Sequence, residues 1–397
     1  MKIVIFAHAF APTVGGAQTY IMNLARGLTN GSETPERKTG DSSDFEVTVA
    51  TSAPALGFDD YVLPFRVVRR PGLRESLALI RWADIVLLAG PVFLPLVLSL
   101  IMRKPVAVEH HGYQAACPNG LLLEEPRKVV CPGHFMARRY LRCLRCVGAT
   151  GGWTQAATKV LATFPRRWMC EKVAGNVAVS RHVANRIALP RAEVVYHGVP
   201  DSSESNDNTS GDQATFVYVG RLVSEKGLSL LLEAARLLKD KGFRFRVKII
   251  GDGPERGKLE VSSRELGLSR EVSFTGYLRG DALRDAVGNV TILVMPSICE
   301  ETAGLAAIEH MMRGRPVIAS DIGGLGEVVG GAGLKFRPGD AEDLATCMQR
   351  VLEDRKLTDE LGRRARERAV EMFGVSRMVD EHAVLFRRLA TKGSKHK

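Results

Sequence analysis

Residues 296–310 read Pro-Ser-Ile-Cys-Glu-Glu-Thr-Ala-Gly-Leu-Ala-Ala-Ile-Glu-His. The largely apolar run at 290–295 before this stretch predicts a buried strand, and residues 305–312 predict a short helix. Glu301 is therefore expected on the loop between strand and helix, and Glu309 about one turn inside the helix. A buried strand that leads through a loop into a helix is the repeating unit of α/β proteins.

The start of this predicted helix, just after Gly304, has chemistry suited to a phosphorylated ligand. Its unpaired N–H groups favour an anion such as a diphosphate. Glu301 and Glu309 would repel that anion, so we infer that they accept hydrogen bonds from hydroxyl groups. A sugar nucleotide supplies phosphates and two sets of hydroxyls in one molecule, which makes it the ligand that this stretch predicts.

Strand and helix signals alternate along the whole chain. Strands are expected at 2–7, 45–51, 85–89, 106–109, 177–180 and 193–196, and again at 216–219, 246–250, 272–274, 292–295 and 316–319. Helices are expected through 23–28 and at 229–239, 254–266 and 281–286, followed by a long charged helical region at 340–389. This alternation predicts mostly parallel sheets with helices on both faces, that is, an α/β fold.

Residues 201–213 contain no apolar side chain and predict a linker between two domains. We expect one domain at 1–200, a second at 214–374, and a final helix with a basic tail at 375–397. A chain of 397 residues favours two domains over one. In doubly wound sheets, ligands bind at the carboxyl ends of the strands.

The charge of +11 is concentrated in one half, because residues 1–200 hold 24 Lys and Arg against 14 Asp and Glu. This favours an acidic partner: an anionic membrane surface, a lipid phosphate or an acidic glycan. A generally basic proteome is the alternative, and no motif indicates nucleic acid. The uncharged stretch 85–102 is broken by Gly90, Pro91 and Pro95, so it predicts a buried strand, a turn and a buried helix rather than a membrane span. The seven cysteines follow no signal peptide, which favours a cytoplasmic protein.

Two cations follow the first strand of the second domain, in Gly220-Arg221-Leu-Val-Ser-Glu-Lys226-Gly227. Arg221 can bind a phosphate bidentately, and Lys226 acts as a point charge. Either residue alone would suggest a surface salt bridge. Both together, at the carboxyl end of a strand, favour diphosphate binding.

Two glycine-containing loops and one histidine complete the candidate site. Gly15-Gly16 and Gly251-Asp-Gly253 follow predicted strands, where each marks either a turn or a backbone close to phosphate or sugar. His111 follows the strand that ends at Glu109. It is either a donor or proton-transfer group facing a ligand, or an ordinary surface histidine.

The order of these motifs resembles the retaining glycosyltransferases of family 4. The resemblance is carried by Gly220-Arg221-x4-Lys226-Gly227, Gly251-Asp-Gly253-Pro254, Glu301-x7-Glu309 and Pro316-Val-Ile-Ala-Ser-x-x-Gly323-Gly324. It extends to the Gly15-Gly16 loop, His111-Gly112 and Val194-Val-Tyr-His-Gly198, so it covers the whole chain. The resemblance implies the GT-B fold: two Rossmann-like doubly wound domains facing a cleft, with the last helix crossing back to the first domain.

The same resemblance implies a role for each site residue. Arg221 and Lys226 would hold the donor diphosphate, and Glu309 the ribose hydroxyls. Glu301 would hold the donor sugar, aided by backbone N–H groups around Gly304 and Leu305. His111 would approach the transferred sugar. The resemblance implies retention of configuration, no required metal and a same-face displacement.

Two positions depart from the family pattern. Ala303 stands where the family often has Phe, which enlarges the pocket slightly. Glu300 directly precedes Glu301, so the register of the sugar-binding carboxylate rests on the spacing and on Gly304.

The implied function is a cytoplasmic, NDP-sugar-dependent hexosyltransferase, peripheral on the inner face of the cytoplasmic membrane. It would move a sugar from a UDP- or GDP-sugar to a glycan, lipid-linked or small-molecule acceptor in cell-surface polysaccharide biosynthesis. A sugar-nucleotide epimerase on the same fold is one alternative. A non-catalytic glycan-binding protein is the other.

An insert at 112–148 contains four cysteines, Cys117, Cys131, Cys143 and Cys146, with His134 between them. They would bind a structural zinc ion tetrahedrally or exist as reduced or redox-active thiols. The insert also contains arginines among apolar residues, and 166–168 reads Arg-Arg-Trp. That composition predicts a surface for an anionic bilayer or a solvated helical face.

Overall fold

The computed structural model describes residues 1–12, 15–30, 45–202, 214–288 and 292–394. They form two compact units. The first contains Met1–Arg127, Cys131–Pro200 and Met372–Lys397, and the second contains Asp201–Glu371 with the short segment Lys128–Val130.

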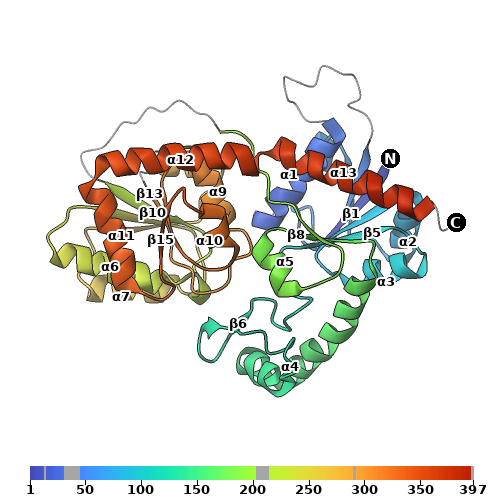
Figure 1. Cartoon of the computed structure of the whole chain (residues 1–397), viewed down its shortest axis with the longest axis horizontal. Helices are drawn as coiled ribbons and strands as arrows, with labels where there is room; N and C mark the ends of the chain where they lie inside the picture. The colour runs from blue at the N-terminus through green and yellow to red at the C-terminus, as the bar shows by residue number, and fades with distance from the viewer. Residues whose placement is uncertain (13–14, 31–44, 203–213, 289–291, 395–397) are drawn as a thin grey trace. The chain divides into compact units, whose positions relative to one another are not determined.

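The first unit is built on a seven-stranded parallel sheet in the order β3-β2-β1-β4-β5-β8-β9 (Figure 1). Its strands are β1 (Lys2–Ala7), β2 (Glu46–Thr51), β3 (Arg66–Arg69), β4 (Ile85–Ala89), β5 (Val106–His110), β8 (Gly175–Ala178) and β9 (Ala192–Val194). Its α-helices are α1 (Gly16–Asn30), α2 (Leu73–Trp82), α3 (Phe93–Ile101), α4 (Tyr140–Lys172), α5 (Arg181–Ile187) and α13 (Val375–Ser394). Residues 3–7 of β1 are all buried because helices cover both faces of the sheet.

The second unit repeats this architecture with a six-stranded parallel sheet in the order β12-β11-β10-β13-β14-β15. Its strands are β10 (Thr215–Val219), β11 (Arg246–Ile250), β12 (Val272–Gly276), β13 (Ile292–Met295), β14 (Val317–Ser320) and β15 (Leu334–Phe336). Its α-helices are α6 (Leu228–Asp240), α7 (Arg256–Glu265), α8 (Gly280–Gly288), α9 (Leu305–Met312), α10 (Gly323–Val329), α11 (Ala341–Glu353) and α12 (Arg355–Phe373). In both sheets the strand order reverses direction beside the first strand, as in doubly wound nucleotide-binding folds.

The last helix, α13, packs on α1 within the first unit (Figure 1). The contact is close at Gly27, where an added Cβ would lie 2.3 Å from the Cγ2 atom of Val379. Met378, Val379 and Phe386 of α13 are buried in the same hydrophobic cluster as Ile3 and Ile5 of β1. Residues from both ends of the sequence therefore share one core.

The predicted strands and the helix at 305–312 are confirmed to within about two residues at each end. The expectation that α3 is a buried helix is wrong. It is buried on one face only, and Leu94 and Ile101 are 48% and 73% exposed. The structure adds β3 and β15, which the sequence pattern did not predict. The linker expected at 201–213 falls largely outside the described residues. Within the described part of the chain, we find no helix with the length and apolarity needed to cross a bilayer.

Candidate active site

Glu301 and Lys226 form an ion pair in the second unit. The Nζ atom of Lys226 donates a short hydrogen bond to Oε1 of Glu301, and Oγ of Ser297 donates to the same oxygen at 2.6 Å. The side chains of Lys226 and Glu301 are only 19% and 12% exposed. Burial by itself would raise the pKa of Glu301, but the Lys226 ammonium and these hydrogen bonds lower it below its usual value. Both groups are therefore charged at neutral pH.

The loop that carries Glu301 is fixed by backbone contacts on two sides. The N–H of Gly324 donates to the carbonyl oxygen of Glu301 at 2.6 Å, and the N–H of Ile298 donates to the carbonyl oxygen of Glu225 at 3.0 Å. Gly323 has a φ of 60°, and an added Cβ would lie 2.6 Å from the Glu301 carbonyl oxygen. Glycine is needed at this position for both reasons.

Arg221 lies in the same loop region as Lys226 but has a different environment. Its side chain is 73% exposed and lies 3.9 Å from the Glu225 carboxylate. Lys226 ends a 3-10 helix, Ser224–Lys226, that follows β10. The structure therefore places both predicted diphosphate ligands after the carboxyl end of β10. Lys226 is bound to Glu301, while most of the Arg221 side chain is open to solvent.

Gly304, Leu305 and Glu309 lie at the start and in the middle of α9, as predicted. Gly304 adopts a left-handed conformation with a φ of 68° and directly precedes the helix. The Glu309 side chain is half-buried, and within the described part of the chain its carboxylate makes no hydrogen bond. Burial raises the pKa of Glu309, and Arg313 offsets this only in part. An unpaired, half-buried carboxylate is well suited to accept hydrogen bonds from a ligand.

The structure also shows where the other two predicted glycine loops lie. An added Cβ on Gly251 would lie 1.8 Å from the carbonyl oxygen of Gly220, so close packing of two strand ends is sufficient reason for this glycine. Gly15 immediately precedes α1, and Gly16 is its first residue. Their contacts with a donor remain predictions.

In the first unit, Glu109 is at the centre of a buried polar network. It accepts hydrogen bonds from the Tyr20 hydroxyl at 2.5 Å and from Nε2 of His382 at 2.9 Å, and His111 Nε2 lies 3.2 Å from its other oxygen. Burial would raise the pKa of Glu109, but the hydrogen bonds from His111 and His382 lower it far below its usual value. Glu109 is therefore an ionised carboxylate with no exposed surface.

Three histidines belong to this network. Nδ1 of His382 lies 2.8 Å from the carbonyl oxygen of Met378, and its Nε2 lies 2.9 Å from Glu109. Nε2 of His111 faces Glu109 at 3.2 Å, and its Nδ1 lies 3.2 Å from Nε2 of His197. Burial lowers the pKa of His197 to about 3, which keeps that ring neutral.

His111 is therefore less available than its sequence context suggests. Its side chain is 12% exposed, and both ring nitrogens have protein partners. The sequence interpretation did not include Tyr20, His197 or His382 in this group. The sequence motif around Gly198 contains His197 and could have indicated it. No local sequence pattern indicates His382.

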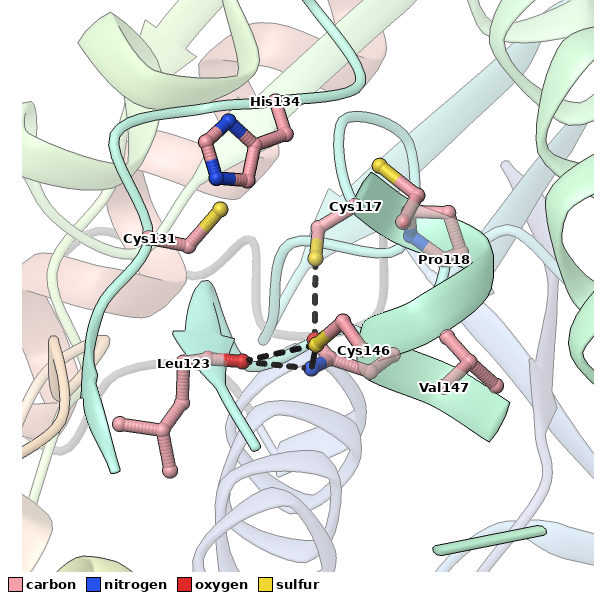
Figure 2. A pocket seen from close by; sticks show the side chains of 9 residues that line it. Cys117, Pro118, Leu123, Cys131, His134, Cys146 and Val147 are labelled. Carbon is pink, nitrogen blue, oxygen red and sulfur yellow. Dashed lines mark hydrogen bonds between the residues drawn. The ribbon is translucent and has the colours of Figure 1, made fainter. Parts of the chain in front are cut away.

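The four cysteines of the insert and His134 line one small cavity in the first unit (Figure 2). Within the described ranges of the chain, no three His, Cys, Asp or Glu side chains are arranged to hold a metal ion as they stand. All seven cysteines are free thiols.

Comparisons with known proteins agree with this geometry. Residues 201–368 match the family model of the glycosyl transferases group 1. The 2-deoxystreptamine glucosyltransferase of Streptomyces kanamyceticus is 31% identical over 235 residues, which cover 54% of this chain and 60% of that protein. The sulfoquinovosyl transferase SQD2 of Arabidopsis thaliana is 36% identical over 165 residues, which cover 40% of this chain and 31% of that protein. The chain thus spans about a third to three fifths of the length of these two relatives.

Solved structures match over the whole fold. HepE of Anabaena, crystallised with UDP and glucose, superimposes with a TM-score of 0.71 at 17% identity, covering 98% of this chain and 100% of that one. The sucrose-phosphate synthase of Thermosynechococcus elongatus gives a TM-score of 0.74 at 19% identity, covering 98% and 99%. The expectation of two Rossmann-like domains is confirmed. The chain therefore carries a glycosyl transferases group 1 domain at residues 201–368 within a GT-B fold.

Proposed function

We propose that this protein is a retaining glycosyltransferase of family 4 that uses a nucleoside-diphosphate sugar as donor. The observation that carries the proposal is the buried Lys226–Glu301 pair, with Ser297 on the same carboxylate oxygen. The pair lies at the carboxyl end of a parallel sheet, where ligands of such folds bind. An exposed arginine and the start of a helix accompany it. Together these groups suit a ligand that has both phosphates and hydroxyls. The family match over 201–368 supports this assignment.

In this proposal the residues of the second unit hold the donor. Arg221 and Lys226 bind the diphosphate, and the N–H groups at Gly304 and Leu305 contribute to the same anion site. The free energy of activation falls because these groups stabilise the negative charge that develops on the leaving diphosphate. Glu301 accepts hydrogen bonds from the donor sugar, and Glu309 accepts them from the ribose.

His111 enters the proposal with a narrower role than the sequence suggested. Its Nε2 faces Glu109 and its Nδ1 faces His197, so donation to a sugar hydroxyl requires a turn of the ring. Glu109 is completely buried and already accepts several hydrogen bonds, which excludes it as an attacking nucleophile. Same-face displacement without an enzyme nucleophile and without a required metal is the proposed mechanism.

We further propose that the enzyme works on the inner face of the cytoplasmic membrane, with a glycan or lipid-linked acceptor in cell-surface polysaccharide biosynthesis. The apolar stripe of α4 supports this, since Trp153, Leu161, Phe164 and Trp168 recur on one helical face and are 41–68% exposed. Arg166 stacks its guanidinium 4.8 Å from the centre of the Phe93 ring of neighbouring α3. Exposed aromatic residues beside cations are typical of surfaces that dock on anionic bilayers.

Thermal-shift screening with UDP- and GDP-sugars, followed by NMR of the anomeric proton in the product, tests the proposal. We expect one class of nucleotide sugar to raise the melting temperature and the product to keep the donor's anomeric configuration. Inversion would remove the retaining assignment. Conversion of the donor without an acceptor would favour the epimerase, and no shift with any nucleotide sugar would favour a glycan-binding protein.

A further inference from the structure

The segment 111–139, between β5 and α4, has little regular secondary structure. Its regular structure consists of two strands of two residues each, β6 (Leu123–Glu124) and β7 (Val129–Val130). Three of its non-glycine residues have left-handed backbones: Leu122 (φ 51°), Lys128 (φ 52°) and Arg138 (φ 59°). Phe135 of this segment shares a small buried hydrophobic cluster with Cys143 and Val160 of α4. A segment of this kind generally needs a cross-link or a metal ion.

Four thiols from distant parts of this segment meet at one cavity (Figure 2). Cys117 follows β5, Cys131 follows β7, and Cys143 and Cys146 lie in the first two turns of α4. All four are 6–8% exposed. The space open to the centre of a water molecule is about 10 Å³, which is enough for a single small ion. Such convergence is expected of a ligand site and is hard to reconcile with cysteines used only as small apolar residues.

His134 lines the same cavity and is 3% exposed, yet neither of its ring nitrogens makes a hydrogen bond. Figure 2 shows its ring beside the Cys131 thiol. Glu124 is its nearest ionic neighbour, at 3.9 Å from Nε2. Buried polar groups without a partner are uncommon, and they often mark the place of an ion or water.

The surroundings of one thiol favour a bound cation. Two N–H groups point at one sulfur: the Glu125 backbone N lies 3.4 Å, and Asn119 Nδ2 3.5 Å, from Sγ of Cys146. Hydrogen bonds of this type stabilise metal-bound thiolates.

We propose that this cavity binds one zinc ion through the sulfur atoms of Cys117, Cys131, Cys143 and Cys146. Each thiol loses its proton to solvent on binding, so that a zinc ion with four thiolates carries a net charge of −2. The side chains of the described residues are not at ligating geometry as they stand, so the thiols turn towards the cavity centre on binding. Four protein ligands leave no open coordination position, and the ion is structural. His134 packs against the site and is not a ligand.

Metal analysis of the full-length chain tests this inference independently of glycosyl transfer. The protein is expressed with added zinc, purified under reducing conditions and assayed by plasma mass spectrometry. We expect about one zinc ion per chain. Cobalt added to the chelator-treated protein should give the strong sulfur-to-metal charge-transfer absorption of a four-thiolate site. Absence of both zinc and cobalt binding overturns the proposal.

Variants identify the ligands. Cys117→Ser and Cys146→Ser should each lower zinc affinity by at least tenfold. Cys347→Ser, which removes an equally buried thiol of the second unit, should keep the metal. If the first two variants do not fold, cobalt titration of the wild-type chain still shows whether the site binds a metal through thiolates. Zinc loss in His134→Ala would overturn the four-thiolate ligand set, and a Cys143–Cys146 disulfide found by mass spectrometry in the purified protein would overturn the metal site.

Discussion

The Nε2 atom of His382 lies 2.9 Å from the Oε1 atom of Glu109, and neither side chain has any exposed surface. The two residues are separated by 273 positions in the sequence. This buried ion pair joins the last helix to the carboxyl-terminal part of β5, and Tyr20 donates a hydrogen bond to the same carboxylate oxygen. The pair therefore connects three segments of the first unit at the point where His111 is oriented.

Replacement of His382 by Gln should destabilise the first unit by about 3–5 kcal/mol, because the buried Glu109 carboxylate would lose the hydrogen bond from His382. Urea unfolding followed by tryptophan fluorescence measures this. Trp82, Trp153 and Trp168 are the only tryptophans in the chain, and all three belong to the first unit. The double variant Glu109→Gln/His382→Gln should recover part of the loss. An unchanged unfolding midpoint in the single variant would contradict the assigned ion pair.

Acid stability should depend on Glu109. Its pKa is lowered in the folded state from the usual value of 4.5, so the unfolded state binds more protons as the pH falls. The stabilisation from Glu109 is complete above pH 4.5 and declines progressively below it. Unfolding free energies from pH 7 to pH 3 should fall less steeply in Glu109→Gln than in the wild type. Parallel slopes below pH 4.5 would show that another carboxylate controls acid unfolding.

Substitution of Lys226 by Met should reduce turnover by at least about 100-fold, since it removes a cation from the proposed leaving group. It should also destabilise the second unit, because the Glu301 carboxylate would keep only the Ser297 hydrogen bond. Activity assays and thermal melting by circular dichroism measure the two effects. Lys258→Met is the matched control: this lysine is 76% exposed and pairs with Glu255 on the surface, so both quantities should be nearly unchanged.

The Glu309→Gln variant should be more stable than the wild type without ligand, and should bind the nucleotide more weakly. Burial raises the pKa of Glu309 when the protein folds, so the folded state favours the protonated carboxyl group. Stability from this residue is present at low pH and is lost as the pH rises through the raised pKa. At neutral pH the uncharged glutamine removes the free-energy cost of burying the charged carboxylate. Melting temperatures with and without UDP test both effects, and a lower melting temperature in the ligand-free variant would contradict the assignment.

Trp168→Glu should weaken binding to vesicles of phosphatidylglycerol and phosphatidylcholine, because it places a negative charge within the apolar stripe of α4. Co-sedimentation with these vesicles, compared with phosphatidylcholine alone, is the measurement. Tyr61→Glu provides the control, since Tyr61 is 98% exposed in the same unit but lies outside α4. Equal loss of binding in both variants would indicate a general charge effect rather than a docking surface.

The sequence predicted the fold best where apolar residues form uninterrupted runs. Residues 2–7, 85–89 and 292–295 match strands of the structure to the residue. The pattern missed β3 and β15, since Arg-Val-Val-Arg and Leu-Lys-Phe are short edge strands in which exposed charges interrupt the apolar signal.

In the candidate site, too, local sequence patterns could be predicted and long-range contacts could not. The second-unit residues lie in two loops and one helix start, so local spacing was enough to group them. The partners of Glu109 could not be grouped in this way, because Tyr20 and His382 are brought to it only by tertiary packing. The ion pair between Lys226 and Glu301 was also not predicted, because the sequence motifs assign Lys226 to the phosphate and Glu301 to the sugar.

The position of α13 in the first unit has a consequence for the order in which the protein can mature on the ribosome. Asp201–Glu371 of the second unit forms one nearly continuous stretch of the chain, and it is complete before α13 is translated. Translation of the first unit begins earlier. Its last residues to be made include Met378, Phe386 and His382, and His382 is a partner of Glu109. During synthesis, the amino-terminal sheet therefore has an incomplete core, and Glu109 lacks its His382 partner, while the domain encoded after it can already fold.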